Sequence, residues 1–195
     1  MEREADVSRR TGETAVRVRI KLDGRGASDI ATGIGMLDHL LAQLARFSLF
    51  DLEIQASGDV EVDPHHTVED VAITLGEALK EALGEKRGIV RTASAIVPMD
   101  DALALAAVDL GGRGYGRIEI SFDAPFLGRL PTELIKHFLE SFAREGRFNL
   151  HILLLGGWNS HHKAEAVFKA LGKALGEAAR IDPRVGDVPS TKGIL

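Results

Sequence analysis

Seven histidines are the side chains of this 195-residue chain that point most directly to chemistry. Four of them stand in the strings HHTVE and HHKAE, which begin at His65 and His161 and end at Glu69 and Glu165. On a helix, residues four positions apart lie on the same side, so each string presents an imidazole and a carboxylate together. Such donor sets bind divalent metals such as Mn, Fe, Co or Zn, and the Irving–Williams order keeps the sequence from selecting one.

The two strings belong to a longer segment that occurs twice in the chain. The first copy begins with HLLAQLARF at His39, and the second begins with HFLESFARE at His137. Equivalent positions of the two copies hold six histidines and two glutamates, which divide into two sites of three histidines and one carboxylate each. We interpret all eight as metal ligands: His39, His65, His66, Glu69, His137, His161, His162 and Glu165.

Neighbouring histidines on a helix point about 100° apart, so the two members of a pair do not easily bind the same ion. Two metals per repeat, or metals shared between sites, follow from this geometry. The competing explanation is that these histidines cap helices or pack in a polar interface. Repetition of the whole pattern favours the metal sites.

The periodicity of apolar residues predicts the elements that must position these side chains. Each copy reads as a helix carrying the first histidine, a short strand, and a helix that opens at the double histidine. The predicted strands cover residues 51–56 and 149–155, and the predicted second helices cover residues 65–83 and 161–179. Apolar residues at three-and-four spacing give each of these helices one buried face.

Alternating polar and apolar residues predict further strands upstream of each copy, at residues 14–22 and 92–110. The break from Pro98 to Asp101 turns the second stretch into a hairpin, so Asp100 and Asp101 are interpreted as turn residues rather than metal ligands. The predicted fold is α+β: one domain, residues 1–195, of two half-domains (about 1–90 and 91–195), each with antiparallel strands and two helices. The helices pack either against each other in a helix-cored pseudo-dimer or between subunits, and we expect a homo-oligomer.

The composition narrows the class of protein. Without cysteine, a disulfide framework, a thiolate metal site and a cysteine nucleophile are excluded. The N-terminal residues are charged, and no apolar run is long enough for a membrane span, so we expect a cytoplasmic protein without a membrane partner. A net charge of -5 with interspersed signs argues against nucleic acid and favours a small-molecule partner.

Several longer strings together resemble imidazoleglycerol-phosphate dehydratases: MLDHL, DPHHTVEDVAITLGEALKEALG, VPMDDALALAAVDLGGRGY, GWNSHHKAEAVFKALGKAL and PSTKGIL. The resemblance runs from about Arg10 to Leu195. It implies a duplicated fold like domain 2 of ribosomal protein S5, an oligomer of 24 subunits, and two Mn2+ ions per active site between subunits. The implied activity is a lyase of L-histidine biosynthesis that dehydrates D-erythro-imidazoleglycerol phosphate to imidazole-acetol phosphate plus water. The resemblance further implies a dinuclear manganese site and an imidazolate-type intermediate.

The resemblance also implies roles for individual residues. The family's metal ligands fall on the eight residues that the repeat selects, and His39, His65 and Glu165 count among the catalytic residues. Glu13 corresponds to the acid/base glutamate, which also contacts the substrate. The phosphate contacts correspond to Arg91, Arg113, Ser190 and Lys192. A guanidinium can hold two phosphate oxygens at once, while a lysine supplies a point charge.

Plainer explanations exist for these residues, since Glu13 can be a solvated strand-edge carboxylate and the cations can serve surface solubility. Two other functions also fit the histidines: a binuclear metallohydrolase acting on a phosphoester, and a metal-storage or structural cage without chemistry. Both leave Glu13 and the phosphate-binding set without a purpose. Release of inorganic phosphate separates the hydrolase from the dehydratase.

Overall fold

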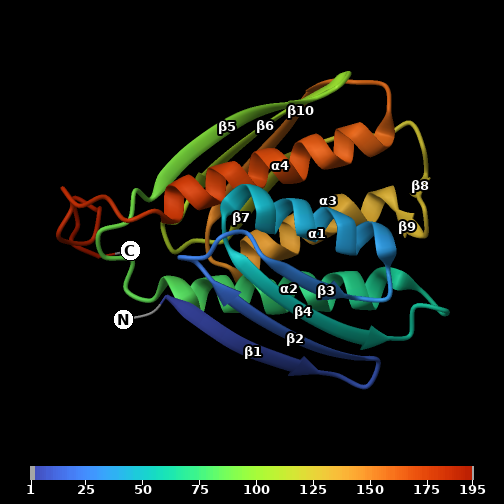
Figure 1. Ribbon diagram of the computed structural model, residues 1–195, viewed down its shortest axis with the longest axis horizontal. Coiled ribbons are helices and arrows are strands. Elements are labelled where there is room, and N and C mark those ends of the chain that lie inside the picture. Colours follow the sequence, from blue (N-terminus) through green and yellow to red (C-terminus); the bar gives the residue numbers. More distant parts are fainter. Residues whose placement is uncertain (1–2, 195) are drawn as a thin grey trace.

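The computed structural model describes residues 3–194 and places four long helices between two four-stranded sheets (Figure 1). The first sheet has the order β1 (Glu4–Arg10), β2 (Thr14–Lys21), β4 (Asp51–Gly58) and β3 (Ser28–Ala31). The second has the order β5 (Thr92–Met99), β6 (Ala102–Asp109), β10 (Asn149–Gly156) and β7 (Tyr115–Glu119). A short hairpin, β8 (Phe126–Leu127) and β9 (Leu130–Pro131), precedes the third helix. The predicted domain includes residues 1, 2 and 195, which lie outside the described residues.

The helices are α1 (Gly35–Ser48), α2 (Pro64–Leu83), α3 (Thr132–Glu145) and α4 (Ser160–Ala179). The predicted strands and helices are confirmed, with ends that shift by up to two residues. The predicted hairpin is confirmed as well, because β5 pairs antiparallel with β6 across the turn at Asp100 and Asp101.

The prediction of antiparallel strands alone was wrong, because each sheet is mixed. The edge strand β3 runs parallel to β4, and β7 runs parallel to β10. In each case a helix, α1 or α3, connects the parallel pair, as a crossover connection requires. Both edge strands are short, which is why alternation did not reveal them. The two halves thus repeat one order of elements, while the division near residue 90 stays a prediction.

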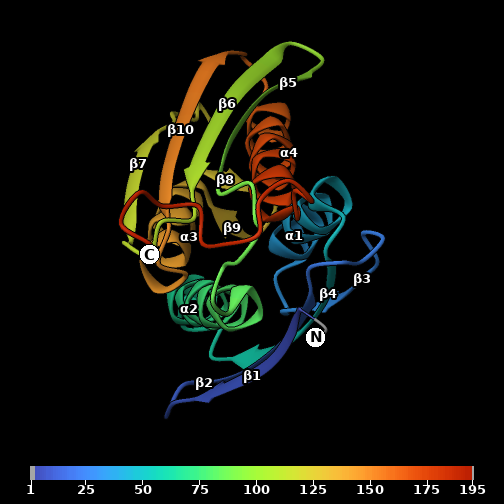
Figure 2. The ribbon, with the colours of Figure 1, turned by 90° about the vertical axis from the view of Figure 1, so that its left-hand side faces the viewer.

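The two sheets enclose the helices in four layers (Figure 2). Helix α2 covers β1 and β2, and α4 covers β5 and β6. In the middle, α1 packs on α4 and α2 packs on α3. This is the helix-cored arrangement, in which helices of the two halves pack against each other within one chain.

Two equivalent glycines let the helices of different halves approach closely. A Cβ atom on Gly76 of α2 would lie 2.7 Å from the backbone nitrogen of Gly146, just after α3. A Cβ atom on Gly172 of α4 would lie 2.8 Å from the carbonyl oxygen of Leu44 on α1. No side chain fits at either place. The close helix packing brings side chains of the two halves within hydrogen-bonding distance of each other.

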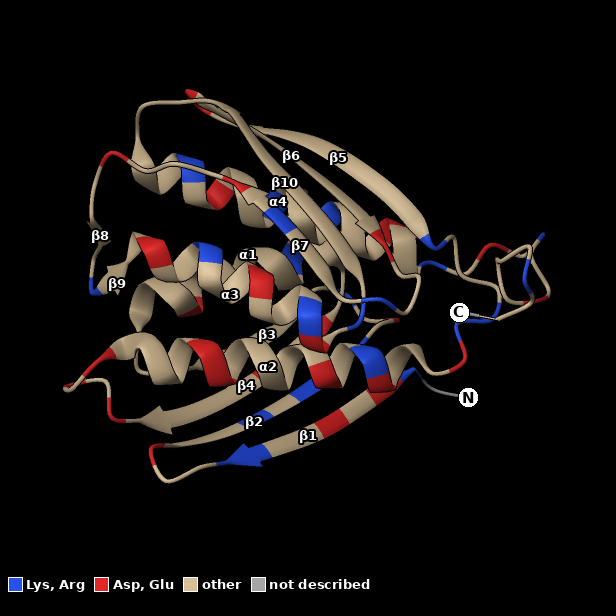
Figure 3. Cartoon of the chain, turned by 180° about the vertical axis from the view of Figure 1, so that it is seen from behind, with Lys and Arg blue, Asp and Glu red and all other residues tan. Residues whose placement is uncertain are grey.

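The outer faces of the two sheets differ in charge. The first sheet carries an exposed network in which Asp6 pairs with Arg17 and Arg19. The second sheet is almost free of charge on β5, β6 and β10 (Figure 3), and Ile96 and Leu155 on it are 60% and 50% exposed. Among residues 3–194, no helix combines the length and the apolar composition that a membrane crossing requires.

Candidate metal centres

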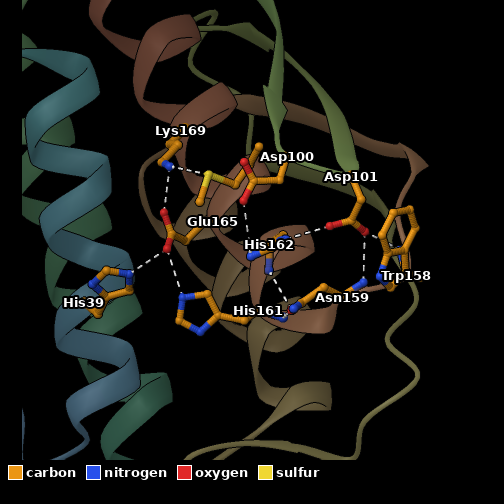
Figure 4. Close-up of polar contacts among 10 residues, drawn as sticks. His39, Asp100, Asp101, Trp158, Asn159, His161, His162, Glu165 and Lys169 are labelled. Atoms are coloured by element: carbon orange, nitrogen blue, oxygen red, sulfur yellow. Dashed lines mark hydrogen bonds and ion pairs between the residues drawn. The ribbon is translucent and has the colours of Figure 1, made fainter.

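One cluster of possible metal ligands joins helices α1 and α4. Glu165 Oε1 lies 3.0 Å from His39 Nε2 and 2.9 Å from His161 Nε2 (Figure 4). The Glu165 side chain is buried at 7% exposure, whereas both imidazoles are partly exposed. The cluster therefore opens to the surface on its histidine side. We call it the Glu165 centre.

The equivalent cluster joins helices α2 and α3. Glu69 Oε1 lies 3.1 Å from His137 Nε2, and the rings of His137 and His65 are 4.6 Å apart at their centres. One nitrogen or oxygen of each of the three residues lies within 4.8 Å of the others. We call this cluster the Glu69 centre. The Glu69 side chain is 34% exposed, so it is more accessible to solvent than that of Glu165.

Helix caps fix where the histidine strings begin. Asp63 precedes Pro64 and accepts a hydrogen bond from the backbone N–H of His65 at 2.8 Å. Asn159 accepts from the backbone N–H of His161 at 2.9 Å. Both are favoured N-cap residues because their side chains satisfy N–H groups that have no partner inside the helix. The caps place each double histidine in the first turn.

The second histidine of each pair points away from its centre, as the rotation of about 100° per residue requires. His66 Nδ1 lies 3.1 Å from Asp59 Oδ2, and His162 Nδ1 lies 2.6 Å from Asp101 Oδ1. The expectation of three histidines and one carboxylate per site is therefore not met within one chain. Each centre gathers two histidines and one glutamate.

Four residues whose contacts with these histidines and glutamates were missed in the sequence are Asp59, Asp100, Asp101 and Lys169. Asp59 and Asp101 hold Nδ1 of His66 and His162, so that Nε2 is the nitrogen left to bind a ligand; in His162 this Nε2 lies 3.5 Å from Oδ2 of the exposed Asp100. Asp101 does lie in the predicted turn, but it also accepts from the backbone N–H groups of Trp158 and Asn159 at 2.6 and 3.0 Å. A helical i,i+4 spacing from Glu165 was the available signal for Lys169.

The charged form of Glu165 is strongly favoured. Burial would raise the pKa of its carboxyl group, but hydrogen bonds from Lys169, His39 and His161 outweigh burial and lower the pKa to about 2. A backbone hydrogen bond from Asn159 and further bonds from His162 and Trp158 hold the pKa of Asp101 well below its usual range, against the effect of its burial. Both carboxylates are ready to serve as anions at neutral pH.

The donor sets suit a divalent first-row metal. Ligand atoms about 2.1 Å from an ion, at adjacent corners of an octahedron, lie about 3 Å apart. The contacts between carboxylate and imidazole in both centres have this separation. Two nitrogens and one oxygen leave positions for further ligands, as a catalytic site needs.

Glu13 lies beside His66, the neighbour of the Glu69 centre's His65, rather than at an isolated strand edge. Its Oε2 atom is 3.6 Å from His66 Nδ1, and its side chain is 58% exposed. Together with Asp59 and His66 it forms a third group of possible ligand atoms. Glu13 thus faces solvent next to a histidine that points outward.

The predicted phosphate contacts gather at a separate pocket of about 720 Å³, lined by Arg91, Arg113, Ser190 and Lys192 among others. Arg91 is already engaged, with Nε 2.8 Å from Asp109 Oδ1 and Nη1 2.8 Å from the carbonyl oxygen of Pro189. Arg113 follows Gly112, whose φ of 82° lets the chain turn there. Three of the residues that line the pocket, Arg91, Arg113 and Lys192, are cationic.

The pocket and the metal centres lie at opposite ends of the folded molecule. The backbone N–H of Arg91 donates to the carbonyl of Ala178, at the end of α4, whereas His161 lies at its start. A helix of 20 residues spans about 30 Å. Figure 1 shows α2 and α4 running in the same direction, so both double histidines lie at the end of the molecule away from the phosphate pocket. One small substrate therefore does not reach both sites within one chain.

Comparisons with known proteins identify the family that this chain matches. The family model described as imidazoleglycerol-phosphate dehydratase matches residues 32–175. The imidazoleglycerol-phosphate dehydratases of Roseiflexus sp. (strain RS-1) and Desulforudis audaxviator (strain MP104C) are 57% and 58% identical to this chain. Each match covers 99% of this chain and 98% of the relative.

Two solved structures share the fold. The crystal structure of imidazoleglycerol-phosphate dehydratase from Staphylococcus aureus subsp. aureus N315 aligns with a TM-score of 0.83 and 34% identity, covering 92% of this chain and 99% of that one. The enzyme from Pyrococcus furiosus, solved in complex with (S)-C348, aligns with a TM-score of 0.83 and 38% identity. That match covers 97% of this chain and 100% of the other.

Proposed function

The chain belongs to the imidazoleglycerol-phosphate dehydratase family, and we propose that it works as a dinuclear manganese enzyme whose active sites lie between subunits. Membership makes it a lyase of the dehydration step in histidine biosynthesis. The single observation that carries the metal proposal is the pair of equivalent His/His/Glu clusters, one at each crossing of helices from different halves.

The proposed ligands are the two centres plus the outward histidines of neighbouring subunits. His66 and His162 each have Nδ1 held by an aspartate, and we propose Nε2 as the metal-binding nitrogen; in His162 this atom lies 3.5 Å from Oδ2 of the exposed Asp100, which the metal would displace. Supplied by another copy, they would complete the expected sets of three histidines and one carboxylate. When bound, the metal ions supply Lewis-acid polarisation of the substrate's imidazole ring and hydroxyl groups. Manganese is proposed from the family, because the donor types alone do not select it.

Assembly follows from the separation of the two kinds of site. The phosphate pocket of one chain is a helix length away from that chain's metal centres, so a substrate that uses both needs two chains. The uncharged outer face of the second sheet, with Ile96 and Leu155 exposed, is the kind of surface that packs against another copy. We propose a homo-oligomer, with the 24-subunit assembly as its expected form.

The chain's own residues bind the substrate and move its protons. Arg113 and Lys192 are exposed at the phosphate pocket and bind the phosphate, with Ser190 donating a hydroxyl hydrogen bond. Arg91 also lines this pocket, but its charge is paired with Asp109 at 2.8 Å, so we assign it the smaller share of phosphate binding. Glu13 is the proposed acid/base, because it is an exposed carboxylate beside His66, at the metal-binding end.

In the proposed reaction, the substrate loses the hydrogen of carbon 2 as a proton and the hydroxyl group of carbon 3 as hydroxide, which together make one molecule of water. The resulting enol tautomerises to the ketone, so no oxidant or further reactant is needed. In this route the substrate reacts as its imidazolate. Glu13 exchanges protons at the glycerol chain, which requires it to come within about 3 Å of the reacting group.

The direct test measures conversion of imidazoleglycerol phosphate by chelator-stripped protein, before and after addition of Mn2+, with inorganic phosphate followed in parallel. Ketone formation restored by Mn2+ without phosphate release supports the proposal. Phosphate release would indicate the metallohydrolase, and no reaction with any metal would indicate the storage or structural cage.

The phosphate pocket has its own test. Replacing Arg113 or Lys192 by alanine should raise KM by about 10-fold or more with a smaller change in kcat, since these residues bind a group that does not react. Arg25→Ala is the control, because Arg25 is exposed and lies outside the pocket. Unchanged KM in both variants would remove the pocket from the mechanism.

A further inference from the structure

The two metal centres differ by one positive charge, which the internal repeat makes visible. Lys169 lies one helical turn after Glu165, and its Nζ atom is 2.7 Å from Glu165 Oε2 (Figure 4). The equivalent residue of α2, one turn after Glu69, is Ile73. Within residues 3–194, no lysine or arginine lies within ion-pair distance of Glu69.

Lys169 is held in place by several contacts. Its side chain is 13% exposed, and Nζ lies 3.0 Å from the sulfur of Met99 and 5.7 Å from the centre of the Phe47 ring. In the described part of the chain, Glu165 is the one acid within ion-pair distance of this ammonium group. Its charge is therefore balanced by the proposed metal ligand itself.

The first half also has a cation near its centre, but a different acid neutralises it. Arg9 donates to Asp70 Oδ1 at 2.7 Å, and Thr14 donates to the other oxygen of Asp70. Asp70 follows Glu69 directly, so this neutral group sits beside the centre without occupying its carboxylate. The equivalent positions in the second half, by sheet register and helix position, are apolar: Val97, Ala102 and Ala166.

The two centres consequently carry different net charge. With neutral imidazoles, the Glu69 centre has a charge of about -1, while Lys169 brings the Glu165 centre close to zero. A divalent ion entering the second centre meets an ammonium group a few Å away in a partly buried environment, where screening is weaker than in water. It must also compete for a carboxylate that is already paired.

We propose that the two centres bind their metal ions with unequal affinity, the Glu69 centre filling first and the Glu165 centre second, because Lys169 pairs with Glu165. Lys169 acts as a positioning residue, since it holds Oε2 and leaves Oε1 facing His39 and His161. This inference rests on the proposed metal centres. The expected difference between the two dissociation constants is about tenfold or more.

The experiment titrates chelator-stripped, full-length protein with Mn2+ while the signal of the free ion is followed by electron paramagnetic resonance. Wild type should show two classes of site. Glu69→Gln should remove the tighter class and Glu165→Gln the weaker one, which assigns each class to its centre.

The internal repeat supplies matched variants that exchange one residue between the centres. Lys169→Ile should tighten the weaker class by about tenfold and bring the two classes together, whereas Ile73→Lys should weaken the tighter class by a similar factor. Lys169→Met, which keeps the length of the side chain, should behave like Lys169→Ile. It guards against a packing defect, and circular dichroism checks the fold of all variants.

The outcomes separate this inference from the proposed function. Two equal Mn2+ affinities in wild type, or an unchanged weaker class in both Lys169 variants, would overturn the inequality while leaving two metal centres intact. Assignment of the weaker class to Glu69 would overturn it as well. Absence of any Mn2+ binding would overturn the metal centres themselves and the inference with them.

Discussion

His137 belongs to the second half of the chain, yet its Nε2 atom lies 3.1 Å from Oε1 of Glu69 in the first half. The reciprocal contact joins His39 of the first half to Glu165 of the second at 3.0 Å. Each centre is thus built from both halves, so neither repeat has a complete set of ligands. The duplicated sequence is tied into one functional unit by these two contacts.

Ligands of one centre should act as a unit. Glu69→Gln and His137→Asn should each lose the same single equivalent of Mn2+. The double variant should lose no more than either single variant, because the effects of residues that bind the same metal ion do not add. His65→Asn should behave in the same way, with turnover falling together with metal content. Elemental analysis of purified protein measures the metal.

The seventh histidine is the control for this experiment. His151 lies exposed on β10, outside both centres, so His151→Asn should keep the metal content of wild type. If the double variant Glu69→Gln/His137→Asn lost two equivalents while each single variant lost one, these residues would belong to different sites.

Glu13 should affect turnover and not metal. Glu13→Gln keeps the size of the side chain but removes its ability to exchange protons, so kcat should fall by about 100-fold or more, as expected for loss of a general acid/base. The metal content should stay near that of wild type, because Glu13 is 58% exposed and is not a proposed ligand. Glu53→Gln, on the outer face of the first sheet, is the matched control. A fully active Glu13→Gln protein would exclude this role.

Asp101 should control the ring of His162. Asp101→Asn weakens the 2.6 Å contact to His162 Nδ1 while keeping an oxygen for the N–H groups of Trp158 and Asn159. Residues that orient a metal-binding histidine are worth about 10–100-fold in metal affinity or activity. Asp59→Asn is the parallel variant, because Asp59 holds His66 in the same way. Titration with Mn2+ measures both, and unchanged affinity in both would limit these aspartates to local folding.

The sequence predicted the parts of the site that obey local spacing. The i,i+4 strings place His161 beside Glu165, and the periodic apolar pattern predicts that the two histidine-bearing helices α2 and α4 open at the double histidines. Repetition then identified His39 and His137 as equivalent residues. These are relationships within one element or between copies of it, so they are visible without a structure.

Contacts across the chain were not visible in the same way. Asp59 precedes its partner His66 by 7 residues, whereas Asp101 precedes His162 by 61, so the two equivalent contacts share no spacing. The packing of α1 on α4 and of α2 on α3 depends on the close approach at Gly76 and Gly172, which no periodicity encodes. The short parallel edge strands were missed because four or five residues give too little alternation.

Acid should loosen the segment that leads to the phosphate pocket. The side chain and backbone N–H of Arg184 hold the pKa of Asp182 well below its usual range. A depressed pKa in the folded state means that the stabilisation is fully present above the ordinary value of about 4, declines as the pH falls below that value, and is gone below the folded-state pKa. Metal-free protein should therefore show faster proteolysis after Ile181 at pH 3 than at pH 6.

Variants at Asp182 separate this contact from general acid unfolding. Asp182→Asn should show the fast proteolysis already at pH 6 and a weaker change between pH 6 and pH 3. Asp29→Asn, an exposed aspartate outside the ion pairs of the described residues, should keep the response of wild type. Identical pH profiles for wild type and Asp182→Asn would show that another group controls the segment.

Metal removal should reduce the size of the assembly as well as the activity. Metal ligands must be deprotonated, so binding weakens as the pH falls, and a chelator removes the ions directly. If His66 and His162 complete the centres of neighbouring subunits, each metal ion joins two chains, and its loss breaks that contact. Light scattering should then report a smaller particle after chelation, and Mn2+ should restore the original size. The double variant His66→Asn/His162→Asn should stay small even with Mn2+ present, whereas a chelated protein of full size would show that the outer faces of the sheets alone hold the subunits together.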